Sequence, residues 1–160
     1  MSVNRYLPHV LVLPEDDANR QLANGFLLDP AINIRQVQIL VQVGGWTQVR
    51  DRFVSDHIDA MRKYDGRFMV LLIDFDGHVN RLKTMKAAIP QDLVDRVFIL
   101  GTLSEPEALR QAHSGSYEDI GMGMAEDCRR GTQTIWSHNL LQHNDGELAR
   151  LRSAACGVLF

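Results

Sequence analysis

The sequence predicts an α/β fold: a single three-layer domain with a mainly parallel central sheet of about four strands and helices on both faces. Short apolar runs alternate along the chain with longer amphipathic segments, and no repeat or low-complexity tract interrupts them. The runs at residues 9–13 and 67–73 are apolar almost throughout, which is typical of strands buried on both faces of a parallel sheet. This order of elements favours a Rossmann-like architecture.

Four segments are expected to form the strands: residues 9–13, 35–43, 67–73 and 96–100. In the second segment Val37, Ile39, Val41 and Val43 alternate with other residues, mostly glutamines, which predicts a half-exposed strand near an edge of the sheet. The third segment is the most apolar and is therefore the best candidate for the sheet centre. We expect the first and third strands to be adjacent there.

Amphipathic segments predict the helices. They lie at about residues 17–28, 46–64, 79–88, 117–130 and 147–155, with a further helix start at 104–107. Asp29-Pro30 ends the first helical pattern, Gly44-Gly45 ends the second strand, and Pro106 beside acidic residues is typical of a first helical turn. The chain from residue 1 to 160 is expected to be one domain, with a helical C-terminal extension from about residue 103.

Composition and charge restrict the function classes. The chain has 160 residues, of which 45 % are hydrophobic and 23 % charged, as in ordinary globular domains. Its formal net charge of -3 gives no overall attraction to nucleic acid, so a polyanion must be bound locally. No apolar run approaches the roughly 20 residues of a membrane-spanning helix, and no signal peptide is recognisable, which predicts a cytoplasmic protein without a membrane partner.

Cysteines and histidines give weaker signals. Cys128 and Cys156 are too few and too far apart for a disulfide framework or a zinc site, so we expect both to be buried thiols. His138 and His143 are five residues apart, which does not place them on one helix face and does not favour a paired metal site. We expect their segment to pack on the sheet, the alternative being a contact with phosphate.

Acidic residues follow two of the predicted core strands. Glu15, Asp16 and Asp17 come after the first strand, and Asp74 and Asp76 come after the third. The carboxyl ends of neighbouring parallel strands meet at one edge of a sheet, and residues two apart at a strand end point to the same side. These side chains are therefore expected to share one site.

Several carboxylates in one place repel one another unless a cation neutralises them. Oxygen ligands without an accompanying His or Cys favour Mg²⁺, Mn²⁺ or Ca²⁺ over Zn²⁺. The alternative is that each aspartate caps a helix or forms a turn. Glu15 argues against that alternative, because glutamate does neither well. The sequence thus predicts a divalent-metal site with Glu15, Asp74 and Asp76 as ligands and Asp16 or Asp17 as a further one.

The segments Leu11-Val12-Leu13-Pro14-Glu15-Asp16-Asp17-Ala18 and Leu71-Leu72-Ile73-Asp74-Phe75-Asp76-Gly77 resemble the Toprim domain of topoisomerases, bacterial primases and overcoming-lysogenization-defect nucleases. The resemblance extends over the strand and helix alternation of about residues 9–100. It implies a magnesium-dependent centre for phosphoryl transfer or nucleic-acid cleavage, with Glu15 as general acid/base or metal ligand and Asp74 and Asp76 as metal ligands. Many members of the family have glycine where Asp16 stands here.

A topoisomerase or primase needs additional domains, so the resemblance implies a small Toprim-type nuclease. The expected activity is hydrolysis of phosphodiester bonds in nucleic acid, DNA more than RNA, with Mg²⁺ or Mn²⁺ as cofactor. His78, Arg81 and Lys83 come after the second motif and are expected to bind substrate. The domain could also act as a subunit beside an ATPase partner that supplies DNA binding.

Two other families share parts of this pattern. A receiver domain has acidic residues after its first strand, a phosphoacceptor aspartate after its third and Ser or Thr after its fourth, where Thr102 stands here. The sequence shows no fifth strand ending in lysine, and Asp74 comes unusually late for that family. Haloacid dehalogenase phosphatases use Asp-x-Asp after their first strand instead. A receiver-like signalling or non-catalytic binding module with an acidic metal site is the alternative to an enzyme.

Overall fold

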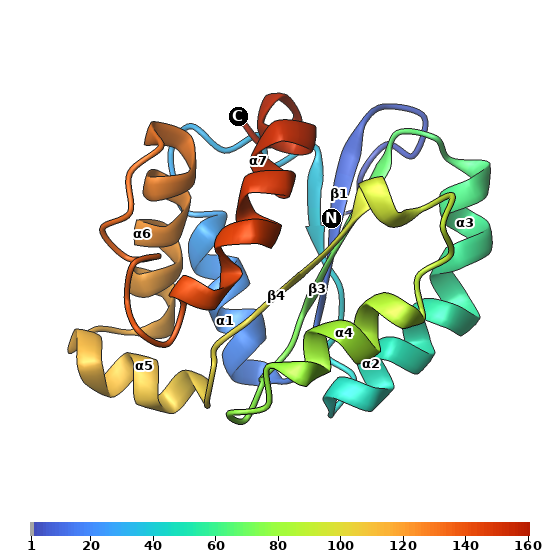
Figure 1. Ribbon diagram of the computed structural model, residues 1–160. Helices are drawn as coiled ribbons and strands as arrows, with labels where there is room; N and C mark the ends of the chain where they lie inside the picture. Colours follow the sequence, from blue (N-terminus) through green and yellow to red (C-terminus); the bar gives the residue numbers. More distant parts are fainter. Residues whose placement is uncertain (1) are drawn as a thin grey trace.

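Four parallel strands form the centre of the structure, a computed structural model that describes residues 2–160 (Figure 1). They are β1 (His9–Pro14), β2 (Val37–Ile39), β3 (Arg67–Leu72) and β4 (Val97–Leu100), in the spatial order β2-β1-β3-β4. The predicted α/β fold is confirmed. So are the central, adjacent positions of the first and third strands and the edge position of the second.

The register between β1 and β3 determines which side chains meet at the two ends of the sheet. The pairing runs in parallel from His9 opposite Arg67 to Pro14 opposite Leu72. Both strands therefore end at the same level. The residues that come next, including Glu15 and Asp74, therefore leave the sheet side by side at the carboxyl ends of the two strands.

The second strand is shorter than predicted. Only Val37–Ile39 forms a ladder with β1, although the backbone N–H groups of Leu40 and Gly44 still donate to the carbonyls of Val12 and Glu15, at 2.8 and 2.7 Å. The alternating pattern in residues 35–43 predicted a longer strand because it reports side-chain polarity and not backbone pairing. The segment from Leu40 to Gly44 instead runs as irregular backbone beside the loop that carries Glu15.

The helices follow the predicted order. They are α1 (Asp17–Phe26), α2 (Trp46–Arg52), α3 (Ile58–Lys63), α4 (Asn80–Ala87), α5 (Pro106–His113), α6 (Tyr117–Arg130) and α7 (Asp145–Leu159). The predicted helix at 46–64 forms as α2 and α3 joined by a π-helical segment, Phe53–His57. The last helix is longer than predicted. No helix in the described part of the chain is both long and apolar enough to cross a membrane.

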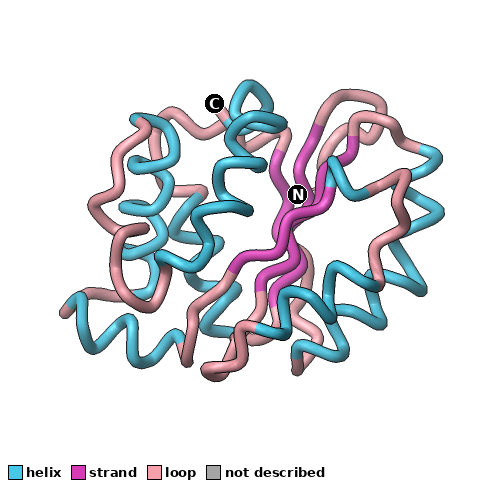
Figure 2. The backbone as a smooth tube through the Cα atoms, viewed as in Figure 1, coloured by secondary structure: helices cyan, strands magenta, loops and turns pink. Residues whose placement is uncertain are grey.

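The helices cover both faces of the sheet, which in Figures 1 and 2 runs between two helical layers. Strand residues alternate between the two cores. Val10 and Val70 pack with residues of α1, α6 and α7, whereas Leu11 and Met69 pack with residues of α2, α3 and α4. The three-layer architecture is therefore as predicted.

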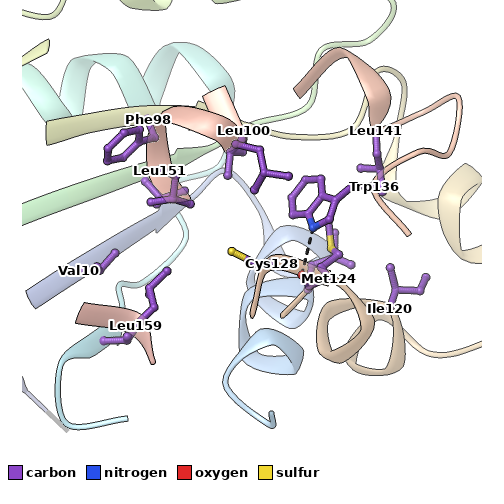
Figure 3. Packing of buried hydrophobic residues seen from close by; sticks show 14 of the residues in the cluster. Val10, Phe98, Leu100, Ile120, Met124, Cys128, Trp136, Leu141, Leu151 and Leu159 are labelled. Carbon is purple, nitrogen blue, oxygen red and sulfur yellow. Dashed lines mark hydrogen bonds between the residues drawn. The ribbon is translucent and has the colours of Figure 1, made fainter. Parts of the chain in front are cut away.

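The segments after Leu103 contribute much of one core. Trp136 lies between α6 and the sheet, and its indole N–H donates to the carbonyl of Met124 at 3.0 Å (Figure 3). Cys128 is buried in the same cluster, as predicted, whereas Cys156 is only half-buried, because its position on α7 lies toward the surface. Both thiols are free.

Side chains of α7 and of the residue before it form hydrogen bonds with the backbone groups at the outer edge of β4. Asn144 accepts from the N–H of Gly101 at 3.1 Å and donates to its carbonyl at 2.9 Å. The buried Glu147 accepts from the N–H of Ile99 at 3.0 Å and pairs with Arg150 at 2.9 Å. Unpaired strand edges are sites of further pairing. Here that edge is closed, and no strand comes after β4 within residues 2–160.

Asp127, near the end of α6, collects the hydrogen bonds that fold the next loop back on the helix. Its carboxylate accepts from the Thr132 hydroxyl and from the backbone N–H groups of Thr134, Ile135 and Trp136, at 2.5 to 3.3 Å. Burial alone would raise the pKa of Asp127, but these hydrogen bonds outweigh it and lower the pKa below its usual value.

Asp127→Asn is expected to lower the free energy of unfolding by about 2 kcal/mol at pH 7, because an amide NH₂ would face backbone donors. A carboxyl whose folded-state pKa is depressed stabilises above its unfolded pKa, and that stability disappears as the pH falls through the folded-state pKa. The difference between wild type and variant should therefore shrink below about pH 4. Urea unfolding of wild type and variant at pH 7 and below about pH 4 measures this difference in stability. The exposed neighbour Glu126→Gln is the control, with an expected change under about 0.5 kcal/mol.

Candidate functional site

Glu15 and Asp74 contact each other across the central strand pair. The Glu15 carboxylate accepts a hydrogen bond from the backbone N–H of Asp74 at 2.6 Å, and the N–H of Glu15 donates to the carbonyl of Leu72 at 2.8 Å. The two acidic segments therefore continue the pairing of β1 and β3 beyond the strands. The structure brings together the two clusters that the sequence predicted to share a site.

Asn19 links Asp16 to Asp74. Asp16 is the N-cap of α1, and its Oδ1 accepts from the N–H of Asn19 at 2.9 Å. The Asn19 amide nitrogen donates to Oδ1 of Asp16 at 3.0 Å and to Oδ1 of Asp74 at 2.8 Å. Asn19 is 0 % exposed, and its own carbonyl oxygen has no partner among the described residues. A fully buried, half-satisfied amide inside an acidic cluster is unusual, because buried polar groups are normally paired.

The turn after Asp74 aims Asp76 back toward the cluster. Asp76 and Gly77 have φ angles of 48° and 75°, the left-handed conformation that aspartate tolerates and glycine favours. The N–H of Phe75 donates to the carbonyl of Thr102 at 3.0 Å, and that of Gly77 to the carbonyl of Leu103 at 2.6 Å. The turn is thus fixed to the loop after β4.

Arg81 lies within the cluster and not only at its rim. Its Nη1 donates to the Asp74 carbonyl and to the Asp76 carboxylate, both at 2.7 Å. Its guanidinium carbon is 4.9 Å from the centre of the Trp46 ring. Stacking on Trp46 holds the guanidinium in place. Arg81 is therefore an internal counter-charge for one carboxylate.

The remaining negative charge is not compensated. Burial raises the pKa of Asp74 to about 7; the hydrogen bond from Asn19 opposes this, and the charges of Asp16, Glu15 and Asp76 add to it. Burial also raises the pKa of Glu15, although the N–H of Asp74 opposes the rise. Carboxyl groups whose protonation is favoured in this way mark a site that lacks positive charge.

The free side-chain oxygens of this cluster are the type of ligand that a hard cation such as Mg²⁺ prefers. Glu15, Asp16, Asp74 and Asp76 each use one carboxylate oxygen in the hydrogen bonds above, and the other oxygen has no hydrogen bond to a described residue. The side-chain carbonyl oxygen of Asn19 is a fifth oxygen without a hydrogen bond. In the side-chain arrangement of residues 2–160, however, no group of three or more His, Cys, Asp or Glu residues is already placed to hold a metal ion. Binding would require these side chains to turn.

Three predicted site residues do not take part in these contacts. Asp17 is exposed and pairs with Arg20 in its own helix, at 2.5 Å. His78 and Lys83 are exposed, and neither side chain makes a hydrogen bond or ion pair with another described residue. They lie on the segment that leads into and through α4.

His143 packs beneath the site. Its ring lies edge-on to that of the buried Phe75, with ring centroids 4.9 Å apart, and burial lowers its pKa. His138 packs instead on His113, at 5.3 Å between ring centroids. The segment is expected to pack on the sheet. The ring of His143 contacts Phe75, which follows β3, whereas the ring of His138 contacts α5.

Sequence reasoning missed Asn19 and Trp46. An asparagine inside a helix reads as a surface residue, and its one signal is its position three residues after the N-cap Asp16, on the same side of the first turn. Trp46 comes directly after Gly44-Gly45 and reads as an ordinary helix start. Its role depends on Arg81, a residue distant in sequence.

Comparisons of the chain with protein-family models, with curated proteins and with solved structures found no match. The main property of the site is an excess of carboxylates at the carboxyl ends of the two central strands, with Asp74 as the buried member.

Asp74→Asn is expected to stabilise the metal-free protein at pH 8 by about 1 to 2 kcal/mol. A carboxyl whose folded-state pKa is raised to about 7 holds a proton that the unfolded chain has released, so stability falls as the pH rises from about 4 to 7. Asp74→Asn has no carboxyl group at this position, so its stability does not fall in this way as the pH rises.

Denaturant unfolding in EDTA at pH 5 and pH 8 measures the effect. The matched control Asp17→Asn removes an exposed carboxylate and should change stability by less than about 0.5 kcal/mol at both pH values. If Asp74→Asn destabilises the protein equally at both pH values, the carboxylates are not in electrostatic conflict.

Proposed function

We propose that this protein is a Mg²⁺- or Mn²⁺-dependent enzyme that hydrolyses phosphodiester bonds in nucleic acid, DNA more than RNA. The observation that carries the proposal is the direct contact between Glu15 and the Asp74 segment, with Asp76 turned toward the same place. Strand ends that converge at the centre of a parallel sheet are the usual position of active sites in such folds.

Asp74, Asp76 and Glu15 would hold the cation, and Asp16 would be a further ligand. Their unpaired oxygens, together with the unpaired carbonyl oxygen of Asn19, support this assignment. Asn19 would keep Asp16 and Asp74 at a fixed separation. When bound, the cation would neutralise the scissile phosphate and lower the pKa of a water molecule at the site.

Glu15 has a second possible role. The N–H of Asp74 holds one of its oxygens, so the single free oxygen would do one of two things: bind the cation, or accept a proton from the attacking water and return it to the leaving oxygen. Burial raises the pKa of Glu15 toward the range in which a carboxyl group exchanges protons near neutral pH.

Arg81 would bind a substrate phosphate next to Asp76, because its guanidinium presents several donors and is held by Trp46. Lys83 and His78, exposed beyond it, would contact neighbouring phosphates. These positive groups would give a net negative protein a local contact for a polyanion.

The receiver-like alternative has less support. A fifth strand beside β4 would be needed in a receiver domain, and Asn144 and Glu147 occupy that edge here. Thr102 is buried, and its hydroxyl is directed to the carbonyl of Ser104 at 3.2 Å. The residue that the alternative requires beside Asp74 is therefore engaged elsewhere.

We also propose that an ATPase partner can supply DNA binding. The support is limited to the small net negative charge and to the short positive stretch around Arg81 and Lys83, which covers few phosphates.

Metal binding is expected to raise the melting temperature, because the ion would bind only the folded cluster. With 10 mM MgCl₂ against EDTA at matched ionic strength, a rise of about 5 °C is expected, as for an ion present at roughly 100 times its Kd. Glu15→Gln and Asp74→Asn should lose most of it, whereas Asp17→Asn should keep it. An equal melting temperature with and without Mg²⁺ and Mn²⁺ in wild type would contradict the metal assignment.

The activity is measured by incubating pure protein with supercoiled plasmid, single-stranded DNA and RNA in Mg²⁺ or Mn²⁺. Wild type and Asp17→Asn should cleave at similar rates, and Glu15→Gln and Asp74→Asn should be slower by about 10²-fold or more. Cleavage that survives both of these variants would assign the activity to a contaminant or another site. Normal metal binding without cleavage would favour a subunit that needs its partner.

A further inference from the structure

The opposite end of the central strand pair carries an unpaired cluster of positive charge. Arg5, Lys63 and Arg67 surround one aromatic ring, that of Tyr64. The guanidinium carbons of Arg5 and Arg67 lie 6.0 and 5.1 Å from the ring centroid, and the Lys63 ammonium lies 5.4 Å from it. We call these four residues the Tyr64 cluster.

Arg67 is the buried member of the cluster. It is the first residue of β3, is 7 % exposed and lies opposite His9, which is 0 % exposed. Nε of Arg67 donates to Nε2 of His9 at 2.9 Å, and Nδ1 of His9 lies 2.7 Å from the carbonyl of Leu7. Arginine only donates, so Nε2 of His9 must be the acceptor and Nδ1 must carry the proton. The buried guanidinium therefore has a neutral partner.

No carboxylate neutralises this charge. Among residues 2–160, neither Arg67, Arg5 nor Lys63 forms an ion pair, and Nη1 and Nη2 of Arg67 have no hydrogen-bond acceptor. Two buried carboxylates elsewhere do have cationic partners: Asp29 pairs with Arg129 at 3.1 Å, and Glu147 pairs with Lys86 and Arg150.

Arg67 is 7 % exposed, and its Nη1 and Nη2 are not fully buried. Removing most of the hydration of a charge without supplying an opposite charge is costly, and the face of one tyrosine ring compensates only a part of that cost. Arg5 adds to the conflict, because its charge repels that of Arg67 and, together with burial, lowers the pKa of Arg67. Such a cluster becomes favourable when a compact anion with several acceptor oxygens binds to it. Two guanidinium groups and an ammonium group match a phosphate, which carries about two negative charges and at least three free oxygens.

We propose that the Tyr64 cluster is a binding site for a phosphate group, with Nη1 and Nη2 of Arg67, Arg5 and Lys63 as its donors. It lies at the amino ends of β1 and β3, roughly 20 Å along the strands from the acidic cluster at their carboxyl ends. It needs neither a metal ion nor the proposed nuclease activity. A free phosphate compound and the terminal phosphate of a nucleic acid share the chemistry that the site recognises.

The test is a titration of the metal-free full-length chain with sodium pyrophosphate at constant ionic strength, monitored by calorimetry and by the NMR signal of the Tyr64 ring. Saturable binding is expected, with a change at Tyr64. Lys63→Gln and Arg5→Gln should each weaken it about tenfold. Arg130→Gln also removes one positive charge from an exposed position but lies at the end of α6, and it should bind as wild type does.

Two further arms separate the sources and the sites. A short oligonucleotide with a 5′-phosphate should bind more tightly than its unphosphorylated form if the site takes a terminal phosphate of nucleic acid, and equally if it takes only free phosphate compounds. Asp74→Asn should bind pyrophosphate as wild type does, since the acidic cluster is not involved. Arg67→Gln should lose binding; because this residue is buried, its folding is checked by circular dichroism, and the exposed variants decide the matter if it does not fold.

The absence of saturable binding in wild type would overturn the proposal. Equal weakening in Lys63→Gln and Arg130→Gln would also overturn it, because the effect would then be one of net charge. Neither result bears on the acidic cluster, which the metal and cleavage experiments test separately.

Discussion

The structure depends on the register of β1 against β3. In a sheet, a slip of one residue turns side chains to the opposite face, so this register fixes both the two cores and the strand ends. With Pro14 opposite Leu72, the Glu15 carboxylate reaches the N–H of Asp74. With His9 opposite Arg67 at the other end, a neutral imidazole receives a buried guanidinium.

The same strand pair thus separates two uncompensated charges. The carboxyl end has more carboxylates than Arg81 can neutralise, and the amino end has more cations than Tyr64 can accommodate. The net charge of -3 hides both, because charges of opposite sign cancel in the total. Unpaired charge in a folded protein costs stability. Its presence at both ends of the two central strands is the reason that we propose ligands of opposite sign, a cation at one end and a phosphate at the other.

Strand ends and hydrophobic periodicity were enough to predict the fold class and part of the site from the sequence. Glu15, Asp74 and Asp76 could be placed together because parallel strands in the centre of a sheet end at one edge. Asn19 and the inward position of Arg81 could not be predicted, because each depends on a partner that only the folded chain brings near. The closure of the β4 edge by α7 depends likewise on how a distant helix docks, and the sequence pattern of that helix does not report it.

The metal site is tested most directly by a crystal structure of the protein, from crystals grown or soaked in Mn²⁺, with anomalous diffraction recorded to locate the ion. We expect a peak between the carboxylates of Glu15, Asp74 and Asp76, with oxygen ligands at about 2.0 to 2.6 Å and the Asn19 amide still bridging Asp16 and Asp74. An ordered acidic cluster without a peak, with Arg81 unmoved on Asp76, would contradict it.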